Sequence, residues 1–190
     1  MTLQEAIDLL QDKYLDIKKV KDLYNKFGEE IEGLVAMNLS LRTSVYDREK
    51  EKNEIMVKLL TRLSKAKDMS ARWAVAKNPH TPKEVLKELS DDKINLVRAL
   101  CATNPNTPKE ALEKFMEDEK IVRDGLSGNP STPIKYLAIL AKDSDKMVRL
   151  RVAENPSATE EILKELSKDS DLDVSKAAQI HLEKLKKGKA

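Results

Sequence analysis

Apolar residues recur along this 190-residue chain at the spacing of short amphipathic helices. In one kind of segment, paired apolar residues line a single face: Leu86 and Leu89, Leu112 and Phe115, Leu137 and Leu140, Leu163 and Leu166. A second kind has small or apolar residues at i, i+4 and i+5: Val97, Cys101 and Ala102; Val122, Leu126 and Ser127; Val148, Val152 and Ala153. No segment shows the alternation of a β-strand. The pattern predicts an all-α chain built from pairs of short helices.

The helix pairs recur because the sequence itself repeats. Asn-Pro pairs begin at Asn78, Asn104, Asn129 and Asn155, at spacings of 26, 25 and 26 residues. An arginine stands six residues before each asparagine, at Arg72, Arg98, Arg123 and Arg149. Two columns in register across four copies are typical of a stacked solenoid.

Each copy also carries signals for where a helix ends and begins. The proline of an Asn-Pro pair moves the preceding asparagine out of the α region, so a helix is expected to end there. The Thr-Pro that follows predicts the next helix start, with Thr81 as N-cap, Pro82 in the first helical position and Glu84 completing a capping box. In the fourth copy, Ser157 and Glu160 are expected to form the same box.

The pattern "VR…A.NP.TP…L..L..D" resembles the leucine-rich repeat variant family, a helical solenoid similar to HEAT and armadillo arrays. The resemblance covers roughly residues 58–187. It implies a right-handed superhelical α-solenoid in which α-helices alternate with short 3₁₀-like helices, with no sheet. Some members of that family place a cysteine-ligated iron–sulfur module before the repeats. This chain has no cysteine before Cys101, so no such cofactor is expected.

Residues 1–54 lie outside the repeat. Leu3, Ile7, Leu10, Tyr14 and Ile17 alternate in steps of four and three, which predicts one amphipathic helix ending near Gly28, followed by a second helix over residues 29–41. We interpret residues 1–54 as a helical cap or hairpin over the first repeat, and a coiled-coil or partner-binding helix remains the alternative. Residues 55–190 are predicted to form a solenoid of about four repeats with a C-terminal capping helix.

Composition excludes several classes of protein. There are 35 basic and 33 acidic residues, a near-balance that neither favours nor excludes nucleic acid as a partner. A single cysteine rules out an internal disulfide and a multi-cysteine metal centre. The N-terminus lacks the pattern of a signal peptide, and no apolar run is long enough to span a membrane. We therefore expect a soluble cytoplasmic protein.

Candidate chemistry is sparse. The five glycines are scattered and form no phosphate-binding loop. The two histidines, His80 and His181, have no second histidine at ligand spacing, and Cys101 shares a column with apolar residues. No catalytic, cofactor or metal site is predicted, and an enzyme is not expected.

The arginine column has two interpretations. In the structural one, stacked arginines pair with an aspartate column and tie neighbouring repeats together: Asp92, Asp118, Asp143 and Asp169. In the functional one, Arg72, Arg98, Arg123 and Arg149 face the phosphates of a nucleic acid. Residues 1–54 carry 9 basic and 12 acidic side chains, which leaves 26 basic and 21 acidic in the rest of the chain and keeps this alternative open.

Positions that vary on the repeating frame are the places where a solenoid puts recognition. Trp73, the single tryptophan, stands in a column with Ala99, Asp124 and Leu150, and Arg151 follows Leu150. Trp73, Leu150 and Arg151 are therefore our candidates for a binding surface. The sequence predicts a non-enzymatic binding or scaffold protein that docks another macromolecule, with a protein partner preferred over nucleic acid.

Overall fold

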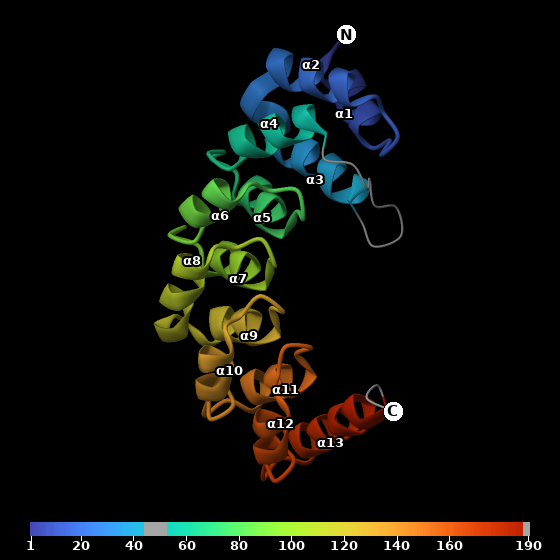
Figure 1. Ribbon diagram of the computed structural model, residues 1–190. Helices are drawn as coiled ribbons and strands as arrows, with labels where there is room; N and C mark the ends of the chain where they lie inside the picture. The colour runs from blue at the N-terminus through green and yellow to red at the C-terminus, as the bar shows by residue number, and fades with distance from the viewer. Residues whose placement is uncertain (44–52, 188–190) are drawn as a thin grey trace.

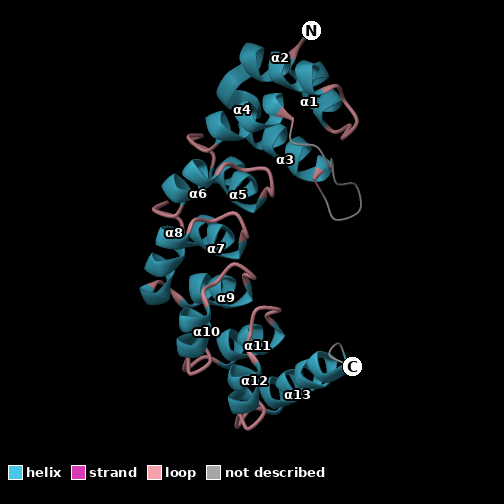
Figure 2. Ribbon diagram, in the orientation of Figure 1, coloured by secondary structure: helices cyan, strands magenta, loops and turns pink. Residues whose placement is uncertain are grey.

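The computed structural model describes residues 1–43 and 53–187, and all regular structure within those ranges is helical. The helices stack in two layers along an arc, with the two termini at opposite ends (Figure 1). The inner side of the arc carries α5 (Met69–Lys77), α7 (Asn95–Thr103), α9 (Lys120–Gly128) and α11 (Lys146–Glu154). The outer side carries α6 (Lys83–Leu89), α8 (Lys109–Lys114), α10 (Ile134–Leu140) and α12 (Glu160–Leu166). The predicted all-α solenoid is confirmed, and Figure 2 shows the loops that join its layers.

Both helices of each repeat are α-helices. Within the described ranges, 3₁₀ turns occur at η1 (Gly28–Ile31) and at η2 (Phe115–Glu117), which continues α8. The expected regular alternation with 3₁₀-like helices is therefore wrong in detail. The inner helices have nine residues each, enough for the i→i+4 hydrogen bonds of more than two α-helical turns.

The N-terminal part contains more helices than the sequence predicted. The single helix expected up to Gly28 is divided into α1 (Leu3–Leu10) and α2 (Ile17–Phe27). The break has a local cause, because the Asp16 carboxylate caps α2 by accepting a hydrogen bond from the Lys18 backbone N–H. Tyr14 lies in the intervening turn and is exposed, whereas Leu10 and Ile17 are buried as expected.

The two-layer stacking continues before the first Asn-Pro pair. Helix α3 (Glu32–Arg42) contacts α5 as α5 contacts α7, and α2 contacts α4 (Glu54–Leu63). At Gly33 in α3, a Cβ atom would lie 2.6 Å from the carboxylate of Asp68, the N-cap of α5. The absence of a side chain thus lets α3 approach the start of α5. The division of the chain at residues 54 and 55 stays a prediction.

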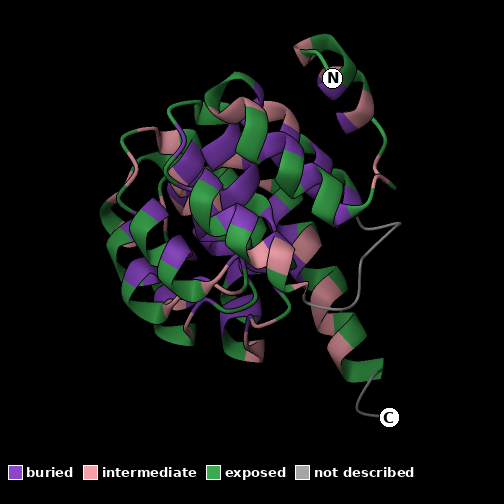
Figure 3. Cartoon of the chain, turned by 90° about the horizontal axis from the view of Figure 1, so that it is seen from above, coloured by how far each residue is buried: buried purple, intermediate pink, exposed green. Residues whose placement is uncertain are grey.

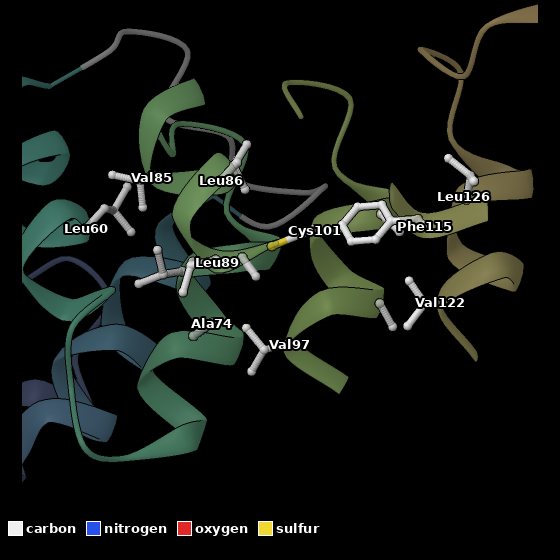
Figure 4. Close-up of a cluster of buried hydrophobic side chains, with 14 of the residues drawn as sticks. Leu60, Ala74, Val85, Leu86, Leu89, Val97, Cys101, Phe115, Val122 and Leu126 are labelled. Atoms are coloured by element: carbon white, nitrogen blue, oxygen red, sulfur yellow. The ribbon is translucent and has the colours of Figure 1, made fainter. Parts of the chain in front are cut away.

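One hydrophobic core runs through the whole array, from Ala6 in α1 to Ala178 in α13 (Leu172–Lys187). Every apolar position predicted from the repeat is buried, including Ser127 in the column of small residues. Figure 3 shows the buried residues gathered between the layers, and Figure 4 shows Cys101 among Leu89 and Phe115. The predicted C-terminal helix is present as α13, which packs against α11 and α12.

Candidate functional site

The asparagines of the Asn-Pro pairs form a hydrogen-bonded ladder between repeats. The Asn104 Nδ2 donates to the backbone carbonyls of Ala76 at 2.8 Å and Asn78 at 3.0 Å. Asn129 and Asn155 make the same two bonds to their preceding repeats. Each side chain is buried, and its Oδ1 accepts the backbone N–H two residues later. The asparagine therefore joins repeats as well as ending a helix, and the predicted helix end is confirmed.

Other residues extend this ladder at both ends. Asn78 Nδ2 donates to the Thr43 hydroxyl at 3.3 Å. Asn38 Nδ2 donates to the carbonyls of Leu10, the last residue of α1, and of Asp12 in the turn that follows. At the far end, His181 stands 26 residues after Asn155, and its Nδ1 lies 2.9 Å from the Ala153 carbonyl. Since a carbonyl only accepts, Nδ1 carries the proton and donates. His181 thus has a structural position that its isolation in the sequence did not reveal.

The Thr-Pro threonines do not cap the helices that follow them, which corrects the sequence prediction. Thr81 Oγ1 donates back to the Val75 carbonyl at 2.6 Å, and the N-cap residue of α6 is Pro82. Thr107 and Thr132 repeat the bond to the preceding inner helix. In the fourth copy, the N-cap is Thr159, and Ser157 Oγ instead donates to the Pro130 carbonyl. These side chains stabilise the turn between the layers.

The arginine and aspartate columns form a second ladder. The Arg98 guanidinium binds the Asp118 carboxylate of the next repeat through Nε and Nη2, both at 2.8 Å. Its Nη1 donates to the Asp92 backbone carbonyl, also at 2.8 Å. The same bidentate pairs recur from repeat to repeat: Arg72 with Asp92, Arg123 with Asp143, and Arg149 with Asp169. Arg98, Arg123 and Arg149 thereby each hold two successive aspartates of the column, because each also donates to the backbone carbonyl of the preceding aspartate. Arg72 donates instead to the backbone carbonyls of Ala66 and Lys67.

The pairs also shift the acidity of the carboxyl groups. Hydrogen bonds from Arg98 and Arg149 hold the pKa values of Asp118 and Asp169 below their usual range. At Asp92 and Asp143, burial raises the pKa, but the arginine hydrogen bonds and the backbone N–H bonds outweigh it and the net shift is downward. The aspartates are therefore charged partners of the arginines over the whole neutral range.

The geometry supports the structural interpretation of the arginine column. All four guanidinium groups are mostly buried and face carboxylates of the protein itself. Nucleic-acid phosphates would have to displace those carboxylates at every repeat. The nucleic-acid interpretation depended on phosphate binding by four arginines that are already paired with aspartates: Arg72, Arg98, Arg123 and Arg149.

A third set of cross-repeat contacts lies at the start of the inner helices. Asn95 Nδ2 donates to Glu119 at 2.8 Å, Lys120 Nζ lies 2.9 Å from Asp145, and Lys146 Nζ lies 3.1 Å from Asp171. Glu119 and the two lysines are exposed, whereas Asn95, Asp145 and Asp171 are partly buried. The two lysine–aspartate pairs neutralise their charges within the protein, and the uncharged Asn95 amide donates to the Glu119 carboxylate.

Next to these contacts, the inner layer exposes an apolar row. Leu96, Ile121 and Met147 follow Asn95, Lys120 and Lys146 in the sequence, and they are 41%, 41% and 36% exposed. We call these three residues the inner row. They occupy equivalent positions on α7, α9 and α11, where neighbouring helices pack about 8–10 Å apart. The next residue in each helix is a fully buried valine, so the inner row is distinct from the core face.

The sequence-predicted binding residues lie on the same layer as the inner row, Trp73 at one end on α5 and Leu150 and Arg151 at the other on α11. Trp73 on α5 is partly buried, with the Lys77 ammonium 5.4 Å from its ring centre. Leu150 and Arg151 lie on α11, where Leu150 packs partly on the core and Arg151 is exposed near Asp124 and Glu154. Sequence reasoning missed the inner row. The sequence contained one signal for it. In three repeats an apolar residue directly precedes the valine that occupies the core position, so the core does not account for that apolar residue.

The remaining candidate chemistry is structural. The Cys101 thiol is fully buried, and desolvation raises its pKa to about 12, so it is a protonated core residue. Among residues 1–43 and 53–187, no three His, Cys, Asp or Glu side chains are grouped to hold a metal ion. In the same part of the chain, no helix has the length and apolar character needed to cross a bilayer.

Comparisons with known proteins found similarity among solved structures alone. No protein-family model matches the chain, and no curated protein does. A solved structure described as "a leucine-rich repeat variant with a novel repetitive protein structural motif" is similar at 22% identity, over 93% of this chain and 80% of the other, with a TM-score of 0.49. The assignment of the fold depends on the helices and ladders described above.

Proposed function

We propose that this protein is a non-enzymatic scaffold that docks a protein partner on the exposed face of α7, α9 and α11. The observation that carries the proposal is the inner row, in which three consecutive repeats expose Leu96, Ile121 and Met147 at the same position. Large apolar side chains presented in register are typical of protein interfaces, whose centres exclude water. The first repeat has Ser70 at this position, so the fold does not require an apolar residue there.

Charge around the inner row favours protein over nucleic acid. The neighbouring lysines, Lys120 and Lys146, are already paired with Asp145 and Asp171. The arginine ladder is paired within the frame as well. A nucleic-acid-binding surface requires basic groups that replace counterions along the phosphates. Few basic side chains on this face lack an acidic neighbour.

The frame suits such a role because it is held by contacts that recur at every repeat. The asparagine ladder and the arginine–aspartate ladder both run across the repeat interfaces. A surface that is ordered before binding loses little conformational entropy when a partner docks. Trp73, Leu150 and Arg151, which lie on the same layer, are candidates for the edge of the docked area.

The test is comparative affinity capture from the source cells. One bait is the wild-type protein, and the second carries Leu96→Ser, Ile121→Ser and Met147→Ser, which copy the natural residue of the first repeat. A third bait, Ile180→Ser, is the control, because it removes an isoleucine of α13 that is even more exposed, at 55%. We expect a protein retained by wild type and by the control but lost from the triple variant.

Two results would contradict the proposal. One is identical retention by all three baits. The other is a nucleic-acid partner whose binding weakens steeply with salt, which would restore the alternative through basic residues outside the arginine ladder.

A further inference from the structure

Helix α10 on the outer layer departs from the other outer helices. The sequences of α6, α8 and α12 are KEVLKEL, KEALEK and EEILKEL, whereas α10 reads IKYLAIL. Ile134 stands where Lys83 stands in α6, and Ile139 stands where Glu88 stands. Both isoleucines are exposed, at 55% and 58%. The third repeat therefore presents apolar side chains to solvent where its neighbours present charges.

These residues form one continuous stripe beside a hollow. Ile134, Ala138 and Ile139 follow the i, i+4, i+5 spacing of one helical face. Between α10 and the end of α8 lies a shallow hollow lined by Ala138, Ile139, Lys142 and, from the 3₁₀ turn η2, Met116. We call Met116, Ile134, Ala138 and Ile139 the α10 patch. Helix α10 lies on the outer side of the arc, in the layer opposite the helices of the inner row (Figure 1).

The fold does not explain the α10 patch. Helices α6 and α12 stack in the same layer with lysine or glutamate at the three equivalent positions. The buried residues of α10, Tyr136, Leu137 and Leu140, already supply its core contacts. Exposed isoleucines are unfavourable in water, so their gathering on one helix points to an occupant.

The charged residues of α10 are basic, whereas the neighbouring outer helices contribute carboxylates: Glu110 and Glu113 of α8 line a second hollow together with Lys135. Helix α10 contains no acidic residue, and Lys135 and Lys142 flank the apolar stripe. Lys142 meets Glu165 of α12 in an exposed pair at 3.4 Å, an arrangement weak enough to exchange partners. The carboxylate that lines the hollow, Asp143, is held by Arg123 at 2.7 Å. Carboxylates on an incoming chain would therefore find ammonium groups beside the apolar contact.

The area of the α10 patch indicates whether its occupant is a second copy of this chain or a smaller partner. Four side chains, two of them half-exposed, offer on the order of a few hundred Å² at most. A standard protein interface buries roughly 800 Å² on each partner. The patch is therefore too small for a stable dimer and matches one face of a short helix.

We propose that the α10 patch binds a short amphipathic helix whose apolar stripe is edged with acidic residues. The apolar stripe would cover Ile134 and Ile139 and place one side chain in the hollow beside Met116. The acidic edges would face Lys135 and Lys142. This inference is independent of the inner row, which lies on the other layer.

The test uses two labelled helical peptides that share a leucine stripe, one edged with glutamates and one with lysines, titrated by fluorescence anisotropy. The protein variant is Ile134→Lys with Ile139→Glu, which copies the residues of α6. Because those residues are compatible with the fold of a neighbouring repeat, the helical circular dichroism spectrum should be unchanged. Ile180→Glu on α13 is the matched control, since that isoleucine is equally exposed.

We expect the glutamate peptide to bind the wild-type chain, the control and the inner-row triple variant alike. Binding should weaken at least about tenfold in the double variant and with the lysine peptide. The inference is overturned if neither peptide binds, if both bind equally, or if the double variant binds as wild type does. It is also overturned if wild type forms a dimer that the double variant abolishes, because the occupant would then be a second copy.

Discussion

Asn104 illustrates how one side chain per repeat can determine stacking. Its amide satisfies two buried carbonyls of the preceding repeat and one backbone N–H of its own turn. The sequence predicted only that a helix ends at this asparagine. The partners of its amide are backbone carbonyls of the preceding repeat, and these do not depend on residue type. The arginine–aspartate pairs could be predicted, since both partners recur as side chains in register.

We predict that Asn104→Ala lowers the free energy of unfolding by about 2–4 kcal/mol, because the Ala76 and Asn78 carbonyls are left buried without a donor. Asn106→Ala is the matched control two residues away. It removes a single bond, to the Pro79 carbonyl at the surface, and should lower the free energy of unfolding by less than about 1 kcal/mol. Urea unfolding of both variants measures the difference, and equal losses would refute the role of the asparagine ladder.

The aspartate column predicts a defined acid sensitivity. The folded-state pKa values of Asp92, Asp118, Asp143 and Asp169 lie below the ordinary value of 3.8. A depressed carboxyl pKa stabilises the fold above the unfolded-state pKa, and that contribution is lost as pH falls through the folded-state value. The free energy of unfolding should therefore decline as pH falls below about 4.

Asp118→Asn isolates this effect at one pair. At neutral pH it leaves the Arg98 guanidinium without its carboxylate, and it should lower the free energy of unfolding by about 2 kcal/mol, between the values typical of exposed and buried pairs. The difference from wild type should shrink in acid, where Asp118 of the wild type is itself protonated. A difference that stays constant from neutral to acid pH would contradict the assignment.

At the scale of elements, the inner helices pack closely where a small residue allows it. A Cβ at Gly125 in α9 would lie 2.6 Å from the Ala99 backbone oxygen of α7 and 3.1 Å from Thr103 Cγ2. The sequence shows a column of small residues on the inner helices, and its members Ala102 and Ser127 are buried. It did not predict that α1 and α2 are separate, because an aspartate that caps a helix competes with an apolar pattern that would continue it.

Two glycines of α9 make a matched pair. Gly125→Ala should lower the free energy of unfolding by about 1–2 kcal/mol, because overpacking against a backbone oxygen exceeds the gain in helix propensity. At Gly128 a Cβ would meet only Arg151 Cδ, at 3.8 Å. Gly128→Ala should therefore raise the free energy of unfolding by about 0.5–1 kcal/mol, because alanine favours the helix over glycine. Thermal unfolding of both variants is the measurement, and a shift of the same sign in both would contradict the packing.

At the scale of the whole molecule, the core is continuous from α1 to α13 and the repeating columns belong to the frame. The sequence predicted that the repeating columns specify the fold and that binding residues occupy positions that vary between repeats. It could not locate the variable surface, because exposure depends on which helical face meets the neighbouring repeat. Trp73 was predicted to bind because it is the single tryptophan. Leu96, Ile121 and Met147 cannot be distinguished from core positions of an amphipathic helix without the structure.

Site-specific photo-crosslinking can detect a protein bound at the inner row inside the cell. A photoreactive amino acid replaces Ile121, at the middle of the inner row, and in a control protein it replaces Ile180 on α13. After irradiation in the source cells, we expect a protein crosslink from position 121 that is absent from position 180. No crosslinked protein from position 121, the same products from both positions, or a nuclease-sensitive product would contradict it.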